Sequence, residues 1–150
     1  MFSRILIVCV GNVCRSPMAE VLLAERLARR RAGATVESAG LRALVGHPAE
    51  RIAQDLMRER GLDLSRHVAR QLTADLGDAF ELILVMERAH ERAVQAIAPN
   101  TRGRIRRLGH FGDFDVPDPF QQERPAFERS LALIERGLEG LEKAFWSARP

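Results

Sequence analysis

The chain has 150 residues, which fits a single domain over residues 1–150 with a hydrophobic core that needs neither disulfides nor a metal. Hydrophobic residues make up 46% of it, an ordinary share for a globular protein, and no apolar run approaches the length of a membrane span. The net charge is +3, but the basic residues are scattered among acids and aromatic residues are few, so we expect a solvated surface that binds neither nucleic acid nor a membrane.

The start of the chain and its cysteine content indicate the compartment. Residues 1–4 lead straight into an apolar run and lack a small-residue cleavage site, so we expect no signal peptide and a cytoplasmic protein. Two cysteines, Cys9 and Cys14, exclude a disulfide scaffold, and no Cys/His set has zinc-ligand spacing. We expect a monomer that uses no metal and no cofactor.

The hydrophobic pattern predicts alternating strands and helices. Continuous apolar runs at 4–9 and 80–86 indicate strands that are buried on both faces. The other predicted elements, in chain order, are a helix from Pro17 that ends before Gly33, a strand at 34–38, a helix from Pro48 to Gly61, a capped turn at Thr73, a helix at 87–98, an edge strand at 104–108 and a last helix at 127–145.

This alternation predicts a single α/β domain with a four-stranded parallel sheet flanked by helices on both faces, a Rossmann-like arrangement. In such sheets, ligands bind outside the carboxyl ends of the strands. Every loop that follows a strand then lies at one edge of the sheet. Residues that are about a hundred positions apart can therefore meet at one site.

The segment 9–17, C-V-G-N-V-C-R-S-P, predicts a phosphate-cleaving loop between the first strand and the first helix. A loop that closes on a helix N-terminus directs backbone N–H groups and the positive end of the helix dipole at one spot. Cys9 is then a nucleophile whose thiolate is populated near neutral pH, and the Arg15 guanidinium matches two phosphate oxygens. A lone cysteine at a strand end is more often a core residue, but the complete string favours a functional loop. The residues that form the phosphate-binding loop are Val10, Gly11, Asn12, Val13, Cys14 and Ser16.

Cleavage of a phosphate ester also needs a proton for the departing oxygen. The loop after the fourth strand carries Asp113, Asp115 and Asp118, and the topology places it at the same edge as Cys9. Asp118 lies between two prolines that stiffen its backbone, and an apolar wall such as Phe120 would keep its carboxyl protonated near neutral pH. We expect Asp118 to be a general acid.

These motifs resemble the signature of the low-molecular-weight protein tyrosine phosphatases, which have C-x5-R-S-P after the first strand and an acid in a D-P motif. The resemblance covers nearly the whole chain. It implies a phosphotyrosine phosphatase I-like fold and a metal-independent enzyme that acts on a phosphotyrosine protein. It also implies that Cys9 is the nucleophile, that Arg15 binds the phosphate, and that the acid is Asp118, the only one of the three loop aspartates that precedes a proline.

The resemblance assigns supporting residues as well. It implies that Asn12 and Ser16 hold the shape of the loop, with Ser38 and His67 in the network around Asn12. Ser16 is also placed to hydrogen-bond the Cys9 thiolate and to ease its departure in the second step.

Further motifs resemble a bacterial group of this family. Leu44 and Phe120 would wall the substrate pocket, and an aliphatic residue in the Leu44 loop resembles bacterial members that act on polysaccharide-export kinases. The V-P-D-P-F run (116–120) and the M-E-R-A-H segment (86–90) resemble the same group. The implied substrate is a bacterial tyrosine autokinase of capsule or exopolysaccharide export. The chain has no tyrosine, so the tyrosines that follow the D-P motif in many members are absent.

Three other functions compete with this interpretation. An arsenate reductase needs further distal cysteines, which the chain lacks. A protein-arginine phosphatase of the same family carries threonine where Val13 stands here. A non-catalytic phosphate-binding module has no need of Cys9, Arg15 and Asp118 together. Cys14 has two open interpretations: it traps oxidised Cys9 as a reversible disulfide, or it is a small packing residue.

Overall fold

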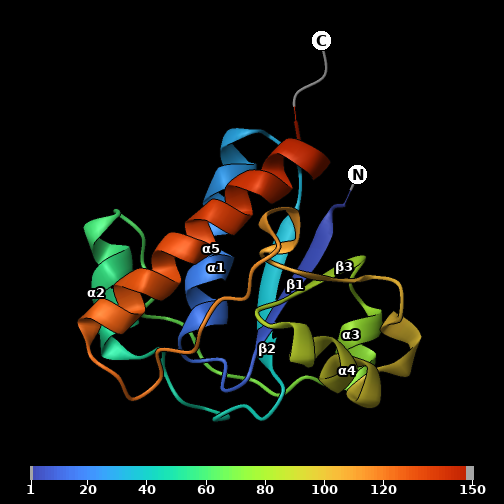
Figure 1. Cartoon of the computed structure of the whole chain (residues 1–150), viewed down its shortest axis with the longest axis horizontal. Coiled ribbons are helices and arrows are strands. Elements are labelled where there is room, and N and C mark those ends of the chain that lie inside the picture. The colour runs from blue at the N-terminus through green and yellow to red at the C-terminus, as the bar shows by residue number, and fades with distance from the viewer. Residues whose placement is uncertain (1, 148–150) are drawn as a thin grey trace.

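The computed structural model describes residues 2–147 (Figure 1). Strands and helices alternate along this part of the chain, with short 3-10 turns at Pro99–Thr101 and His110–Gly112. The strands and α-helices are β1 (Arg4–Cys9), α1 (Arg15–Arg29), β2 (Thr35–Gly40), α2 (Arg51–Glu59), α3 (Ala74–Asp78), β3 (Leu82–Val85), α4 (Arg88–Ile97), β4 (Ile105–Arg107) and α5 (Arg124–Phe145).

The four strands form one parallel sheet in the order β2-β1-β3-β4. The predicted parallel sheet is confirmed, and β4 lies at an edge, as its interleaved polar residues indicated. β1 lies between β2 and β3, so Cys9 at its carboxyl end is near the middle of the sheet edge. The loops that follow β1, β2, β3 and β4 therefore all open toward the place where Cys9 lies.

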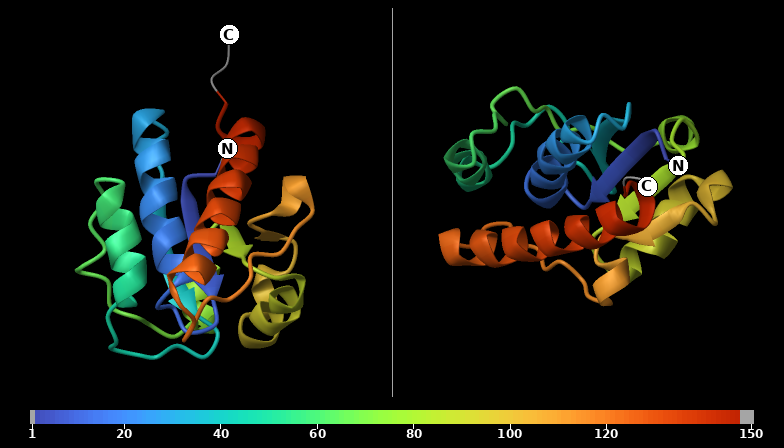
Figure 2. Two further views of the ribbon diagram at one scale, coloured as in Figure 1. Left: turned by 60° about the vertical axis from the view of Figure 1, so that its left-hand side comes forward. Right: turned by 90° about the horizontal axis from the view of Figure 1, so that it is seen from above.

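Side chains of β1 alternate between two apolar cores, one on each face of the sheet. Ile5 and Ile7 belong to a core shared with α1, α2 and α5, whereas Leu6 and Val8 belong to a second core with residues of α4. All four of these side chains are fully buried, as expected for a strand covered on both faces. Figure 1 shows the strands between α1, α2 and α5 on one side and α3 and α4 on the other. The long α5 runs beside α1 (Figure 2).

Several predicted boundaries differ from the structure by a few residues, and two of these differences have a clear physical cause. The helix predicted to begin at Pro48 begins at Arg51, because long-range backbone hydrogen bonds hold the segment before it, and Glu50 has non-helical backbone angles (φ −56°, ψ 144°). The Glu50 N–H donates to the Val13 carbonyl (2.8 Å), and the His47 carbonyl accepts from the Ala69 N–H (2.9 Å). The second difference is the end of β2. The strand predicted to end at residue 38 continues to Gly40, because Gly40 pairs with Cys9 at the end of β1.

Other predicted features are confirmed. The Thr73 hydroxyl accepts a hydrogen bond from the Leu76 N–H (3.1 Å), which caps α3. The last helix is the longest and begins at Arg124, with a proline in its first turn. No helix in residues 2–147 is both long enough and apolar enough to span a membrane.

Gly40 is the point where β2 touches the loop that follows β1. A Cβ at this position would lie 2.6 Å from the Val10 carbonyl oxygen and 2.9 Å from the Ala43 Cβ. The Val10 carbonyl also accepts the Arg42 N–H (3.0 Å), and the Cys9 carbonyl accepts the Leu41 N–H (2.9 Å). Only a glycine allows the two backbones to approach this closely.

We expect Gly40→Ala to destabilise the protein by about 1–3 kcal/mol, because the added methyl must displace backbone rather than a flexible side chain. Urea unfolding measures this change. Gly140→Ala is the matched control: its methyl meets only the Phe111 Cβ, at 3.3 Å, and alanine is the better helix former within α5. Equal urea midpoints for the wild type and Gly40→Ala would contradict the expectation.

Candidate active site

The loop between β1 and α1 has the backbone of an anion-binding turn. Asn12 takes a left-handed conformation, with φ 59°, and the chain then enters α1 at Arg15. Within residues 2–147, the N–H groups of residues 11–16 donate to no backbone carbonyl. These N–H groups stand at the positive end of the α1 dipole, which is the arrangement that binds phosphate in many proteins.

A cavity of about 310 Å³ lies over this loop. It brings Cys9 and Arg15 together with Asp118, Leu44 and Phe120, which come from the loops after β4 and β2. The remaining lining residues are Val10, Gly11, Val13, Cys14 and Arg42.

The Cys9 sulfur is buried and lies 2.9 Å from the Ser16 hydroxyl oxygen. That hydroxyl already accepts a hydrogen bond from the Asn12 side-chain amide (2.8 Å). Because one lone pair of the Ser16 oxygen is occupied by this donor, its own proton is available for the sulfur. The arrangement therefore supplies one hydrogen-bond donor to a thiolate at Cys9.

The side chain and backbone of Asn12 are fixed by several partners, which holds the left-handed turn. Its Oδ1 accepts from the Arg70 N–H (3.0 Å), and its Nδ2 also donates to the Ser38 hydroxyl (3.0 Å). The Ser38 hydroxyl donates in turn to Glu20 Oε1 (2.5 Å). His67 Nε2 lies 2.6 Å from the Asn12 carbonyl oxygen. The structure thus brings Ser38 and His67 into contact with the loop residue that the sequence associated with them.

Arg15 is a buried guanidinium with a single close carboxylate. Its side chain is 1% exposed, and its Nη1 donates to Glu87 Oε2 (2.6 Å) and to the Val116 carbonyl (2.8 Å). Its Nη2 lies 3.5 Å from Asp118 Oδ2, and its Nε has no hydrogen-bond partner in the described part of the chain. A buried donor is rarely left unpaired. The Nε–Nη2 edge is thus the side of the guanidinium left for a second anion, in the fork geometry that a phosphoryl group fits.

Asp118 is held by its own loop. Its Oδ1 accepts from the Phe120 N–H (3.1 Å), and its carbonyl accepts from the Gln122 side chain (2.9 Å). Its side chain is 42% exposed, and the charged group nearest to Oδ2 is Arg15. The predicted apolar wall is present, since Phe120 lines the cavity, but the carboxyl also faces a cation.

The other two aspartates of this loop anchor it away from the cavity. Asp115 Oδ1 accepts from Arg107 Nη1 (3.0 Å) and from the Arg88 N–H (3.0 Å), and Asp113 pairs with Arg107. The hydrogen bond to Arg107 is the main reason why the pKa of Asp113 is lowered and that of Arg107 is raised. Of the three loop aspartates, only Asp118 lines the cavity.

Cys14 is buried and is a free thiol, like Cys9. Burial is the largest cause that raises the pKa of the Cys14 thiol far above its usual range, and the neighbouring Cys9 adds to it. Cys14 is therefore a protonated thiol, unlike the expected state of Cys9.

Sequence reasoning missed two side chains at this site. Glu87, which binds Arg15, follows β3 directly, and its place at the carboxyl edge of a buried strand was the available signal. Arg42 lines the cavity, but no motif distinguishes it from the other arginines of the chain.

The chain belongs to the low molecular weight phosphotyrosine protein phosphatases, because the model of that family matches residues 4–148. This is a family of metal-independent phosphomonoesterases.

The chain is 45% identical over 139 residues to a probable low molecular weight protein-tyrosine-phosphatase, EpsP, of Ralstonia solanacearum, with 93% of each chain covered. It is 46% identical over 137 residues to the phosphatase Wzb of Salmonella typhimurium, covering 91% of this chain and 89% of Wzb. The solved structure of Vibrio vulnificus Wzb in complex with benzylphosphonate superposes with a TM-score of 0.91 at 38% identity, covering 97% of this chain and all of that one. The protein is a low molecular weight protein-tyrosine phosphatase of the Wzb and EpsP type.

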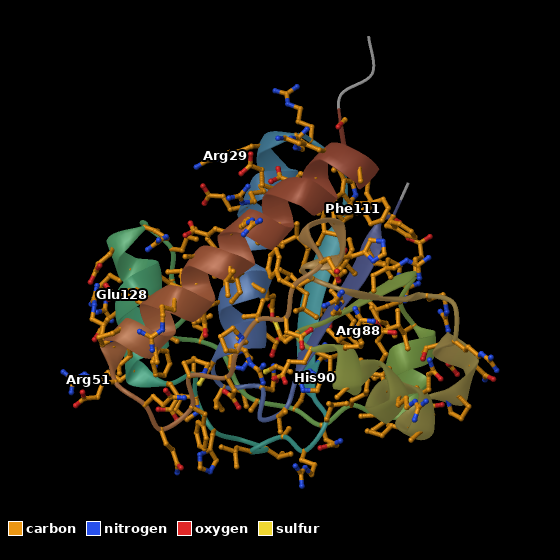
Figure 3. The ribbon with its side chains drawn as sticks, in the orientation of Figure 1. Arg29, Arg51, Arg88, His90, Phe111 and Glu128 are labelled. Carbon is orange, nitrogen blue, oxygen red and sulfur yellow. The ribbon has the colours of Figure 1, made fainter. Side chains whose placement is uncertain are left out.

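His90, in the first turn of α4 (Figure 3), joins the site through Glu87. Its Nδ1 accepts from the Glu87 N–H (3.2 Å), which requires a neutral ring with a free lone pair on that nitrogen. Burial lowers the pKa of His90 below its usual 6.5, although the Glu87 carboxylate opposes this effect. Arg15 also lowers this pKa, whereas Asp115 and Asp118 raise it.

We expect the free energy of unfolding to decrease as the pH is lowered below about 6.5. In this range His90 binds a proton in the unfolded chain, whereas its lowered pKa keeps it neutral in the folded protein. Above 6.5 the ring is neutral in both states and contributes no pH dependence. Urea unfolding at pH 8, 7, 6 and 5 measures the effect against His90→Gln, which can still accept the Glu87 N–H but does not titrate. A stability difference between the two proteins that stays constant over this range would refute the prediction.

Proposed function

We propose that this phosphatase hydrolyses phosphotyrosine through a cysteinyl-phosphate on Cys9, with Arg15 as phosphoryl ligand and Asp118 as general acid. The observation that carries the proposal is the unpartnered Nε of a buried Arg15, in a cavity that Cys9 and Asp118 also line. This arrangement provides a nucleophile, a charge clamp and an acid around the space for one phosphoryl group.

In the first step, the Cys9 thiolate attacks phosphorus in line with the departing phenolate. Arg15 and the N–H groups of residues 11–16 stabilise the equatorial oxygens, where charge gathers in the transition state. The bound phosphoryl group takes the place of Asp118 as second anion at Arg15. The negative charge of the phosphoryl group favours the protonated form of Asp118. This proton is transferred to the leaving phenolate as the P–O bond breaks.

In the second step, Asp118 acts in the opposite sense. Now ionised, it accepts a proton from water as the water oxygen attacks phosphorus, and the P–S bond breaks to give back the Cys9 thiolate. The Ser16 hydroxyl, held by Asn12, donates to the sulfur as it regains negative charge. This support makes the thiolate a better leaving group.

The walls of the cavity favour an aromatic phosphate. Val13, Leu44 and Phe120 line it, so a phenyl ring finds apolar contacts on the way to the phosphoryl site, and Phe120 can stack on the ring. An apolar Val13 also disfavours a phosphoarginine substrate, because a guanidinium needs hydrogen-bond acceptors.

We further propose that the natural substrate is a bacterial tyrosine autokinase of capsule or exopolysaccharide export and that the enzyme acts as a cytoplasmic monomer. Support for the kinase comes from the similarity to EpsP and Wzb phosphatases across most of the chain. The aliphatic Leu44 at the pocket wall is consistent with that group.

We expect Cys9→Ser to abolish hydrolysis of a phosphotyrosine peptide and Asp118→Asn to lower kcat by about 10²–10⁴-fold, the usual contribution of a general acid. The loss for Asp118→Asn should be much smaller with p-nitrophenyl phosphate, because nitrophenolate departs without a proton. Steady-state kinetics in the presence of EDTA measures both effects.

Asp113→Asn is the matched control for Asp118→Asn, since it removes a carboxylate from the same loop but outside the cavity. A phosphoarginine peptide provides the comparison substrate. Faster turnover of phosphoarginine than of phosphotyrosine, or full activity in Cys9→Ser, would overturn the proposed function.

We expect Ser16→Ala to slow the second step by about ten- to a hundredfold, the effect of losing one hydrogen bond to a charged group. The cysteinyl-phosphate then accumulates, so rapid mixing with p-nitrophenyl phosphate should show a burst of one nitrophenol per enzyme before a slow steady state. Ser65→Ala, which removes an exposed hydroxyl outside the cavity, should show neither change. Wild-type kinetics in Ser16→Ala would exclude this role for the hydroxyl.

A further inference from the structure

Arg42 is an exposed arginine at the catalytic cavity that the mechanism does not use. It lines the same cavity as Cys9, Arg15 and Asp118. Within residues 2–147, its guanidinium has neither an ion-pair nor a hydrogen-bond partner, whereas Arg70 of a neighbouring loop binds the Ser38 carbonyl and Glu37. The Arg42 guanidinium is therefore available to bind a negative group of the substrate other than its phosphate.

The backbone around Arg42 is fixed to the phosphate-binding loop. The Arg42 N–H donates to the Val10 carbonyl (3.0 Å), and the Leu44 N–H donates to the Gly11 carbonyl (3.0 Å). Between them, the Ala43 N–H donates to the Gln71 side chain (2.9 Å). Three consecutive residues are thus tied down, so Arg42 starts from a defined position at the rim and loses little backbone entropy when it binds a ligand.

Exposed apolar side chains lie on the loop that carries Arg42 and on the loop hydrogen-bonded to it. Leu44, Val45 and Val68 are 36%, 65% and 61% exposed, and we call them the rim shelf. Two hydrogen bonds join the loops that carry them, from the Gly46 N–H to the Ala69 carbonyl (3.0 Å) and from the Ala69 N–H to the carbonyl of residue 47 (2.9 Å). Grouped apolar exposure beside a polar site is typical of a surface that binds another molecule.

These two features point to the same occupant. An isolated aryl phosphate fills the cavity and has no group for the rim shelf, whereas a polypeptide that carries phosphotyrosine must pass over the rim on each side of that residue. Its backbone and apolar side chains suit the rim shelf. The complement of an unpaired guanidinium is a carboxylate, which it binds with two parallel hydrogen bonds.

We propose that Arg42 is a specificity-determining residue of this phosphatase, which binds an aspartate or glutamate next to the phosphotyrosine of the substrate. The preferred substrate class is then a phosphotyrosine peptide with acidic flanks. This inference rests on the proposed function, because it concerns the same cavity and the same reaction.

The test compares kcat/KM for two matched phosphotyrosine peptides, one with Asp and Glu flanks and one with Asn and Gln at the same positions. The wild type should prefer the acidic peptide by about two- to fivefold, the effect of one exposed ion pair. The preference should shrink in 0.5 M salt because exposed charges are screened. Arg42→Ala should bring the ratio close to one, and Arg42→Glu should reverse it in favour of the neutral peptide.

Arg51→Ala is the control for the loss of one positive charge. Arg51 is exposed at the start of α2, does not line the cavity and points outward from the molecule (Figure 3). This variant should keep the wild-type ratio. A third substrate, p-nitrophenyl phosphate, has no flanking residues and reports on the phosphoryl site alone.

Each outcome separates the inference from the function on which it rests. Equal rates for both peptides in the wild type, or the same preference in Arg42→Ala as in Arg51→Ala, overturn the role of Arg42 and leave the phosphatase activity standing. A loss in Arg42→Ala that is as large for p-nitrophenyl phosphate as for the acidic peptide shows that Arg42 binds the phosphoryl group, which also overturns it. Failure of the wild type to hydrolyse either peptide faster than Cys9→Ser overturns the proposed function as well.

Discussion

A buried guanidinium that is only partly paired is the constraint on which the site depends. A buried charge is costly unless it is both paired and hydrogen-bonded. Arg15 meets this requirement with a carboxylate from the start of α4 and a carbonyl from the loop after β4, while its own backbone belongs to α1. Three segments that are remote in the sequence therefore converge on one side chain. These contacts leave the Nε of the guanidinium without a hydrogen-bond partner, and this is the edge where we propose that a phosphoryl group binds.

The parallel sheet makes this convergence possible. Since every strand runs in the same direction, the loops that carry Cys9, Arg42, Glu87 and Asp118 all leave the sheet at one edge. β1 is buried on both faces, so the position of Cys9 at its end is set by the two cores rather than by the loop. The loop itself contains one left-handed residue, Asn12, and side-chain hydrogen bonds hold it there.

The alternation of strands and helices could be predicted because local hydrophobic periodicity determines it. Cys9, Arg15 and Asp118 could be predicted because a motif and the sheet topology point to the same edge, and the structure places all three on one cavity. Their roles in catalysis stay predictions until kinetics tests them. The start of α2 could not be predicted: Pro48 is a good first residue for a helix, but backbone hydrogen bonds of His47 and Glu50 with distant loops hold this segment outside the helix.

The partner of Arg15 was missed for a similar reason. Glu87 pairs with a residue 72 positions away, and although its place just after β3 puts it at the carboxyl edge of the sheet, no local pattern shows that its partner is Arg15. Composition also left three candidate acids in the loop after β4, of which the flanking prolines and the resemblance to the family both favoured Asp118. The structure adds the physical reason, because Arg107 binds the other two and holds them outside the cavity. Ion pairs between residues that are distant in the sequence cannot be predicted from local sequence patterns.

The two cysteines lie close together in the sequence but in different surroundings. Cys9 ends a strand, and its sulfur faces a hydroxyl that can donate a proton to it. Cys14 lies five residues later in the same loop, where burial and the charge of Cys9 raise its pKa, so it stays a neutral thiol. Two thiolates this close would repel each other and would compete with the phosphoryl group for the same N–H donors. Because Cys14 is neutral, it adds no negative charge to the loop, and the positive potential of the loop N–H groups is left for other anions.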